Sequence, residues 1–220
     1  MFNAQMMQLL AKGIWETLYM TLVSSFLAYL LGLPLGLLLI VTDKNGIRPM
    51  RVLNRLLSFV INFVRSVPFL ILLIAVIPFT RFLVGTSVGS TATIVPLVLA
   101  SAPFVARMVE SSIKEVDRGV VEAAQSMGAS PWQIVWKVLL PEAKPSLILN
   151  AAIATTTILG YSAMAGFVGG GGLGTISINY GFYRYQSDVM LVTVLLLVVI
   201  VQVFQEIGMR IAMKGDKRSH

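Results

Sequence analysis

The fold of this chain is decided by residues 117–141, which read DRGVVEAAQSMGASPWQIVWKVLLP and lie between two long apolar runs. The stretch is rich in charged and turn-forming residues, whereas several apolar runs of the chain approach or exceed the ~20 residues that span a bilayer as a helix. We therefore expect this polar stretch to stay on one side of a membrane and to be presented to something there.

The composition fits a membrane protein. The chain has 220 residues, of which 56% are hydrophobic and 12% are charged, whereas soluble domains carry about 25% charged residues. We predict an all-α integral membrane protein with a single domain over residues 1–220, embedded in membrane lipid. The absence of cysteine excludes disulfides and thiolate metal sites. Nucleic acid is excluded as a partner, because the cations flank apolar runs and form no basic stripe interleaved with aromatic residues.

The apolar runs predict five transmembrane helices, at about 17–41, 56–79, 91–109, 147–168 and 189–213. Between the third and fourth lies a loop of about 110–146, which contains the opening stretch. Pro68 falls inside the second run, where proline is expected to kink the helix.

The distribution of cations predicts the orientation. Loops on one side of the predicted spans, together with the C-terminal tail, hold Lys44, Arg48, Arg51, Arg55, Arg107, Lys114, Arg118, Lys137, Lys144, Arg210, Lys214, Lys217 and Arg218. The other side holds Lys12, Arg81 and Arg184. Because cytoplasmic loops are enriched in Lys and Arg, we expect the N-terminus outside, the C-terminus in the cytoplasm, and the 110–146 loop in the cytoplasm.

The polar stretch is patterned as two short helices. Asp117 is a suitable N-cap for the first and Gly128 a suitable stop. Ser130 and Gln133 have the spacing of a capping box for the second, which we expect to end at Pro141. Such a pair could enter a groove on a protein partner or lie on lipid headgroups, and periodicity alone favours neither.

The same stretch resembles the signature of ABC importer permeases: Glu-Ala-Ala, three residues, Gly, nine residues, an aliphatic residue, one residue, then Leu-Pro. Val138 stands where that family usually has Ile. The resemblance implies a type I ABC importer permease fold in which this loop is a coupling helix that docks into a cleft of a cytoplasmic ATPase. The coupling residues it implies are Asp117, Arg118, Gly119, Glu122, Ala123, Ala124, Gly128, Val138, Leu140 and Pro141.

Three further segments are similar to the permeases of methionine-uptake ABC importers: residues 65–70 (RSVPFL), 116–119 (VDRG) and 160–166 (GYSAMAG). This similarity implies a multi-pass protein of the bacterial cytoplasmic (inner) membrane. It would translocate D- or L-methionine, or a related amino acid, by alternating access after delivery by an external binding protein or lipoprotein.

The fourth predicted span is rich in small residues, and close helix packing explains most of them. The resemblance implies in addition that Tyr161, Ser162 and Met164 line the pathway, with Met164 as a gate residue. The polyglycine stretch 169–174 that follows is expected to be a flexible turn at the outer mouth.

The acidic residues and the fourth predicted span distinguish this function from two others. A self-sufficient secondary transporter would place carboxylates inside the membrane, whereas all ten acidic residues fall in predicted loops or near span ends. A membrane scaffold has no need of a small-residue central span, and a permease for another small amino acid or polar solute stays open.

The chain is not expected to be an enzyme. It has neither a phosphate-binding G-x-x-x-x-G-K-[ST] loop nor a set of catalytic or metal-ligating residues. ATP and Mg²⁺ are therefore expected on two copies of a separate cytoplasmic ABC ATPase. Since five spans are too few to enclose a path, we expect a homodimer with the path at its axis.

Overall fold

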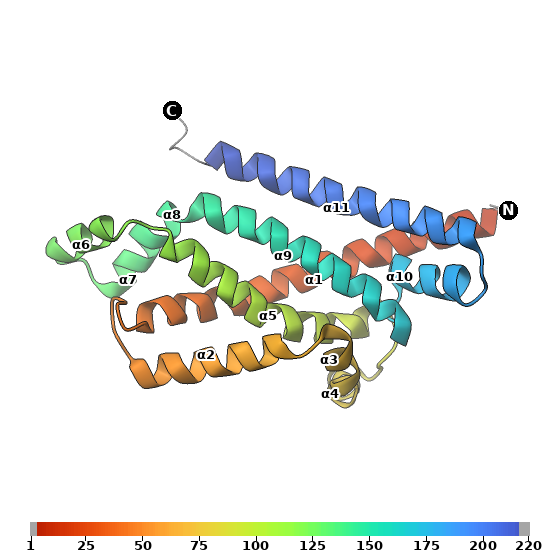
Figure 1. The fold of residues 1–220 in the computed structure, drawn as a ribbon, viewed down its shortest axis with the longest axis horizontal. Helices are drawn as coiled ribbons and strands as arrows, with labels where there is room; N and C mark the ends of the chain where they lie inside the picture. Colours follow the sequence, from red (N-terminus) through yellow and green to blue (C-terminus); the bar gives the residue numbers. More distant parts are fainter. Residues whose placement is uncertain (1–3, 216–220) are drawn as a thin grey trace. The chain divides into compact units, whose positions relative to one another are not determined.

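The computed structural model describes residues 4–215, and within that range every regular element is helical (Figure 1). Lys217 and Arg218, and the chain ends whose orientation the cations predict, lie outside the described residues. The elements are α1 (Ala4–Thr42), α2 (Arg51–Ser66), α3 (Phe69–Ala75), α4 (Ile77–Val84), α5 (Ser90–Lys114), α6 (Arg118–Ser126), α7 (Pro131–Ile134), the π-helix η1 (Val135–Leu139), α8 (Leu140–Glu142), α9 (Lys144–Met164), the 3₁₀ helix η2 (Ala165–Val168), α10 (Gly172–Ile176), the π-helix η3 (Ser177–Phe182) and α11 (Ser187–Gly215).

Four helical segments in the described chain are long and apolar enough to cross a membrane, namely Ala4–Thr42, Ser90–Lys114, Lys144–Phe182 and Ser187–Met213. A fifth span exists only if α2 and α3 are counted together, because neither is long enough alone. The five predicted spans therefore correspond to four long helical segments, of which Lys144–Phe182 is interrupted by the turn at Gly169–Gly171, and to one broken pair.

The break between α2 and α3 bends the chain by 99°. Pro68 sits at the break with an extended backbone, φ −57° and ψ 134°. Its ring restricts Val67 to extended conformations and removes a backbone donor, so the helix ends at Ser66 and restarts at Phe69. The predicted second span at 56–79 is thus not one helix.

The first helix begins well before the predicted start at residue 17. Lys12 and Glu16 lie on one face of α1, with Nζ and Oε1 3.7 Å apart, so these polar residues belong to the helix and not to a preceding loop. Glu16, expected in a loop or near a span end, lies within α1, one residue before the predicted start of the first span.

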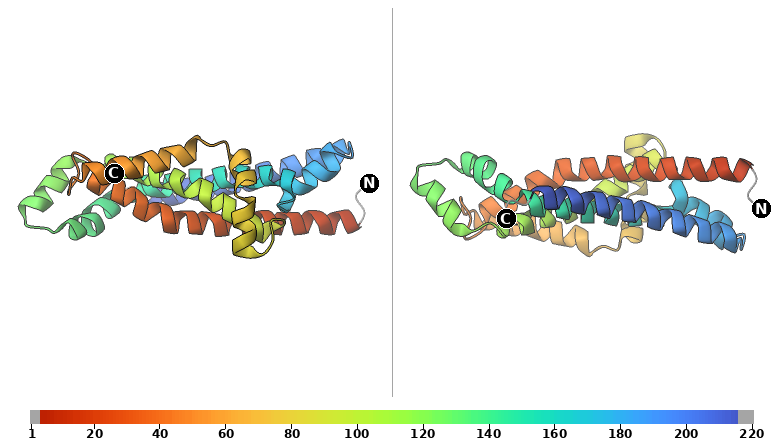
Figure 2. Two further views of the ribbon diagram at one scale, coloured as in Figure 1. Left: turned by 90° about the horizontal axis from the view of Figure 1, so that it is seen from below. Right: turned by 90° about the horizontal axis from the view of Figure 1, so that it is seen from above.

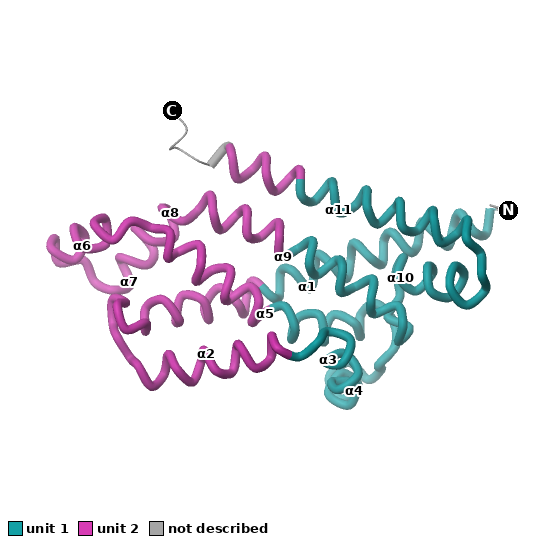
Figure 3. The backbone as a smooth tube through the Cα atoms, in the orientation of Figure 1, with its two compact units in different colours: residues 1–28, 67–101, 155–205 teal, residues 29–66, 102–154, 206–220 magenta. Residues whose placement is uncertain are grey.

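The described chain forms two compact units (Figure 3). Unit 1 comprises residues 1–28, 67–101 and 155–205, and unit 2 comprises residues 29–66, 102–154 and 206–220. The helices α1, α5, α9 and α11 contribute residues to both units.

Unit 2 depends on a close approach of α1 and α5. A methyl group added at Gly32 would lie 2.7 Å from the carbonyl oxygen of Ala102, and one added at Gly36 would lie 2.6 Å from that of Ala106. Glycines four residues apart let the two backbones approach closely. In a membrane the hydrophobic effect does not drive helices together, so this close van der Waals packing is what associates them.

Polar side chains fix the other helices of unit 2. The Nδ2 of Asn54 on α2 donates to the carbonyl oxygen of Leu39 on α1 at 2.7 Å. The Nδ2 of Asn150 on α9 donates to Oγ of Ser112 on α5 at 2.7 Å. The second of these bonds joins α5 to α9, the two helices from which the 110–146 loop emerges.

Unit 1 is organised around the polyglycine stretch. Glu16 Oε2 accepts from the backbone N–H of Gly172 at 2.7 Å, and Thr17 Oγ1 accepts from that of Leu173 at 2.9 Å. Gly172 has φ +72° and Leu173 is fully buried. The stretch is therefore a packed, hydrogen-bonded turn leading into α10, which differs from the flexible turn that the glycines suggested.

Candidate functional site

The loop between α5 and α9 folds into a hairpin of α6 and α7, which extends beyond the last turn of α5 within unit 2 (Figure 2). Asp117 begins α6: its Oδ1 accepts from the backbone N–H of Gly119 at 2.7 Å. This N-cap was predicted from the sequence and is confirmed.

Gly128 ends α6 through a left-handed backbone conformation, φ +80°. The N–H of Ala129 donates to the carbonyl of Ala124 at 3.1 Å, and the N–H of Gly128 donates to that of Gln125 at 2.9 Å. This pair of bonds is the Schellman arrangement, which satisfies the last carbonyls of a helix. The predicted stop at Gly128 is confirmed, and it fixes the turn between the two helices.

The second helix starts with the predicted capping box. Ser130 N–H donates to Gln133 Oε1 at 2.8 Å, and Gln133 N–H donates to Ser130 Oγ at 3.3 Å. Its predicted end at Pro141 is wrong. A π-helical turn over Val135–Leu139 carries the chain helically through Pro141 to Glu142, because the wider turn leaves room for the proline ring.

One side of the hairpin is buried and the other is open. Ala124, Ile134, Val135 and Leu139 are buried within unit 2. On the open side, Met127 is 82% exposed. The hairpin is therefore anchored by its own apolar contacts and still presents an uncovered surface.

The structure places most residues of the predicted coupling set on this hairpin's exposed side. Those that are exposed are Asp117, Arg118, Gly119, Glu122, Ala123, Gly128 and Pro141. Val138 and Leu140 are partly buried, and Ala124 is buried. The signature thus combines positions that face outward with positions that hold α6 and η1 in place.

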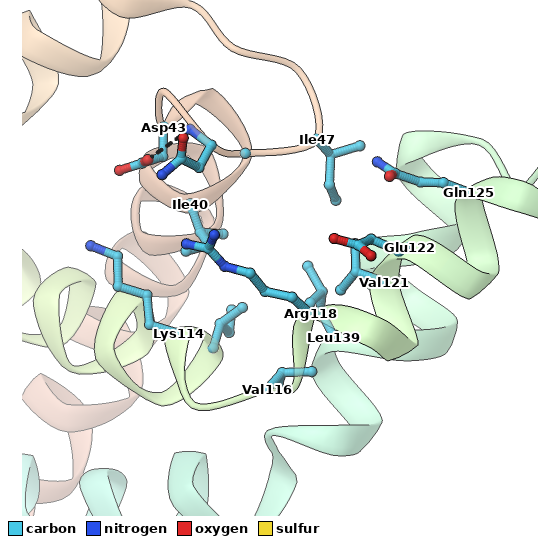
Figure 4. A pocket seen from close by; sticks show the side chains of 13 residues that line it. Ile40, Asp43, Ile47, Lys114, Val116, Arg118, Val121, Glu122, Gln125 and Leu139 are labelled. Atoms are coloured by element: carbon cyan, nitrogen blue, oxygen red, sulfur yellow. Dashed lines mark hydrogen bonds between the residues drawn. The ribbon is translucent and has the colours of Figure 1, made fainter.

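A cavity of about 450 Å³ lies beside α6, between it and the ends of α1 and α5 (Figure 4). Arg118 and Glu122 line it together with Asp43 and Lys114. It is open and of mixed charge, so it can accept a partner's polar side chains at the base of the hairpin.

The three predicted pathway residues lie in unit 1, near the end of α9. Tyr161 stacks on Phe69 with ring centroids 4.5 Å apart and planes inclined by 8°. Ser162 is 1% exposed and its Oγ donates to the carbonyl of Leu159 at 2.7 Å. Met164 is 49% exposed. Of the three, Met164 has the most freely accessible side chain, and Ser162 is turned into its own helix.

Sequence reasoning missed a charged cluster within α5. Glu110 is buried, and its carboxylate bonds Arg107 Nη1 at 2.5 Å and Lys114 Nζ at 2.6 Å. Arg107 Nη2 also donates to Asn62 Oδ1 on α2 at 3.0 Å. The spacing of three and four residues on one helix was the signal that could have revealed the cluster.

Comparisons with known proteins agree on one family. Residues 28–209 match the profile of the binding-protein-dependent transport system inner membrane component. The chain is 51% identical over 210 residues to the probable D-methionine transport system permease protein MetI of Vibrio cholerae, covering 96% of this chain and 93% of that protein. It is 53% identical over 161 residues to MetI of Escherichia coli (strain K12), covering 73% and 74%.

Solved structures give the same result. A chain from inward-facing conformations of the MetNI methionine ABC transporter superposes with a TM-score of 0.96 at 49% identity, covering 98% of this chain and 100% of that one. A chain of an amino acid ABC transporter crystallised with histidines gives a TM-score of 0.79 at 20% identity, covering 96% and 95%. At that identity the second match shows a shared fold alone.

Proposed function

Because this chain belongs to the family of binding-protein-dependent transport system inner membrane components, we propose that it is the permease subunit of an ATP-driven methionine importer of the bacterial inner membrane. The relatives named D-methionine permeases and the MetNI transporter support this substrate. The observation that carries the proposal is the α6–α7 hairpin, a capped and exposed element that repeats the family signature.

The hairpin is built to transmit force. Two side-chain caps and a Schellman turn fix its backbone. A movement of the partner at the tip of the hairpin is therefore passed on to the helices without bending the hairpin. Ala123 is small and exposed, which lets a partner's surface approach the helix closely. These features support docking of the hairpin into a cleft of a cytoplasmic ATPase. With the hairpin in the cytoplasm and five spans, the N-terminus would lie outside and the C-terminus inside.

The energy for transport comes from that partner. The chain has no phosphate-binding loop, so ATP and Mg²⁺ are held by two copies of a separate ATPase subunit, one for each permease of a homodimer. Closure of the two ATPases draws the paired hairpins together and opens the outward face to substrate from an external binding protein. Hydrolysis then restores the inward-facing state.

The substrate path runs beside Met164 at the dimer axis. Met164 is exposed in the single chain, and its flexible, polarizable thioether can close a path and contact a thioether substrate. The Tyr161–Phe69 stack gives this end of α9 a fixed neighbour on α3. Ser162, bonded within α9, acts by shaping the helix that borders the path.

The residues in the helices also argue against a self-sufficient ion-coupled carrier. Such a carrier needs a carboxylate free to bind a proton or cation within the membrane. Glu16, Glu110 and Glu206 lie in α1, α5 and α11, and each holds an ion pair with a neighbouring cation.

The decisive experiment is uptake by the reconstituted complex. The permease and its ATPase are placed in liposomes with the binding protein, and entry of labelled L-methionine, D-methionine and leucine is followed with and without ATP. We expect ATP-dependent entry of methionine in preference to leucine. ATP-independent entry through the permease alone would refute the proposal, and preference for leucine would refute the substrate.

Docking of the hairpin can be tested separately because the chain has no cysteine. A variant with a single cysteine, Ala123→Cys, should cross-link to the ATPase when a cross-linker with a short spacer is added to the complex. Thr86→Cys, at an exposed residue in the turn between α4 and α5, is the matched control and should not cross-link to the ATPase. Equal cross-linking at both positions would contradict the docking assignment.

A further inference from the structure

A second cavity in unit 2 is lined entirely by apolar residues. Its volume is about 470 Å³, and it lies between α1 on one side and α7 with the start of η1 on the other. One wall consists of five residues of α1 between Leu33 and Val41, and the other consists of Pro131, Trp132, Val135 and Trp136. We call it the tryptophan groove.

The position of the groove restricts what can fill it. The α1 wall belongs to a helix long and apolar enough to cross the membrane, and it lies within the first predicted span, at about 17–41. On the facing wall, Trp132 is 70% exposed and its ring centroid lies 5.3 Å from that of Trp136. Tryptophan is the side chain enriched where the hydrocarbon region meets water. These walls therefore favour an occupant that already resides in the membrane.

The charges next to the groove favour an anionic headgroup. Lys137 does not line the groove, but it directly follows Trp136 in the sequence and is exposed, and residues 131–141 contain no acidic residue. Beyond the end of α1, the exposed Lys44 and Arg48 outnumber Asp43, whose Oδ1 accepts from the backbone N–H of Asn45 at 3.0 Å. Basic groups beside an apolar pocket at the cytoplasmic surface are the arrangement that binds acidic phospholipids.

We propose that the tryptophan groove is a binding site for an anionic phospholipid, with one acyl chain between α1 and α7 and the headgroup phosphate at Lys137. Neither Met164 nor any residue of α6 lines the groove, so the site shares no residue with the proposed substrate path or with the α6 surface proposed to meet the ATPase. Since α7 is the second helix of the hairpin, a bound lipid joins that hairpin to α1.

The tryptophans themselves report on the site. Phospholipids with brominated acyl chains quench a tryptophan only on contact, and this chain has three tryptophans. The assembled complex is reconstituted with a fixed fraction of brominated phosphatidylglycerol or brominated phosphatidylcholine. Subtracting the signal of the Trp132→Phe, Trp136→Phe double variant isolates the groove from every other tryptophan in the complex.

We expect brominated phosphatidylglycerol to associate about fivefold more tightly than phosphatidylcholine, the size of effect expected for one Lys beside an anionic headgroup. Lys137→Gln should bring the ratio close to one without changing the groove walls. Lys144→Gln, an exposed cation outside the groove, should leave the ratio unchanged.

Two results would overturn the proposal. Equal quenching by both lipids would show an ordinary lipid-facing surface with no headgroup site. Little quenching by either would show that a protein surface, such as a second copy of the chain, covers the groove. Neither result bears on methionine uptake, so the proposed function and this site are tested independently.

Discussion

Replacing Gly128 tests whether the geometry of the hairpin turn determines coupling. Gly128 has φ +80°, and no atom lies within 4 Å of a methyl group added there. A substitution therefore costs energy through its backbone conformation and not through a clash. The left-handed conformation costs an ordinary residue about 1–2 kcal/mol, Asn tolerates it, and β-branched residues tolerate it least.

This energy sets an upper limit on the effect. A difference of 1–2 kcal/mol changes an equilibrium constant by about 5–30-fold. The strain is present when the turn is closed and is released when it opens, so the apparent affinity of the ATPase for the hairpin should fall by at most that factor. Gly128→Asn should be close to the parent, Gly128→Ala intermediate, and Gly128→Val the weakest.

The measurement is a titration of the purified ATPase against the permease in nanodiscs, followed by methionine uptake per ATP hydrolysed. The half-saturating ATPase concentration should rise in the order Gly, Asn, Ala, Val, and uptake per ATP should fall in the same order. If Asn were as damaging as Val, side-chain bulk and not backbone conformation would be responsible. If Val behaved as the parent, the turn would not matter for docking, and the reasoning would be refuted.

Three further substitutions test other parts of the structure. Glu122→Lys puts a cation beside Lys114 and Arg118 in the cavity next to α6 and should lower uptake per ATP about fivefold, whereas Gln125→Lys, in the same cavity, should lower it much less. Gly36→Ala would bring a methyl group 2.6 Å from the Ala106 carbonyl oxygen and should destabilise the protein by about 1–3 kcal/mol in denaturant unfolding. Gly160→Ala, which meets no atom within 4 Å, should be neutral or stabilising; equal loss at both glycines would contradict the close packing of α1 on α5. Glu110→Gln removes a carboxylate whose side chain is 8% exposed and should cost about 3 kcal/mol. Glu206→Gln, 53% exposed, should cost about 0–1 kcal/mol, and similar unfolding midpoints for the two variants would show that burial of the pair is unimportant.

The caps of the hairpin could be predicted because local chemistry determines them. The bonds of Asp117, Gly128 and Ser130 join residues at most five positions apart, so the short sequence around each one contains the whole interaction. The presence of four or five apolar segments long enough to cross a membrane was also predictable, because the length and apolarity of such runs can be read directly from the sequence.

The remaining differences arise from partners distant in sequence or from backbone details. Glu16 lies inside α1, where it accepts from Gly172, 156 residues away, and no local pattern reveals such a bond. Proline was expected to kink the second span, but the 99° change of direction at Pro68 depends on the packing of the helices on each side. Proline was also expected to stop the helix at Pro141. Instead the π-helical turn at Val135–Leu139 leaves room for the proline ring, so the helix continues to Glu142.

That π-helical turn makes the length of the hairpin segment hard to change. Here the N–H of Leu140 bonds the carbonyl of Val135, five residues earlier, so the turn contains one residue more than an α-helix of the same rise. Deleting one residue from 135–139 would restore regular winding and set the ring of Pro141 against the preceding turn, at a cost of about 3 kcal/mol. It would also rotate the chain on either side of the deletion by about 100° relative to each other. Among homologous sequences, single-residue insertions and deletions should therefore be rarer here than in the turn at residues 43–50, although neither segment lies within a predicted span.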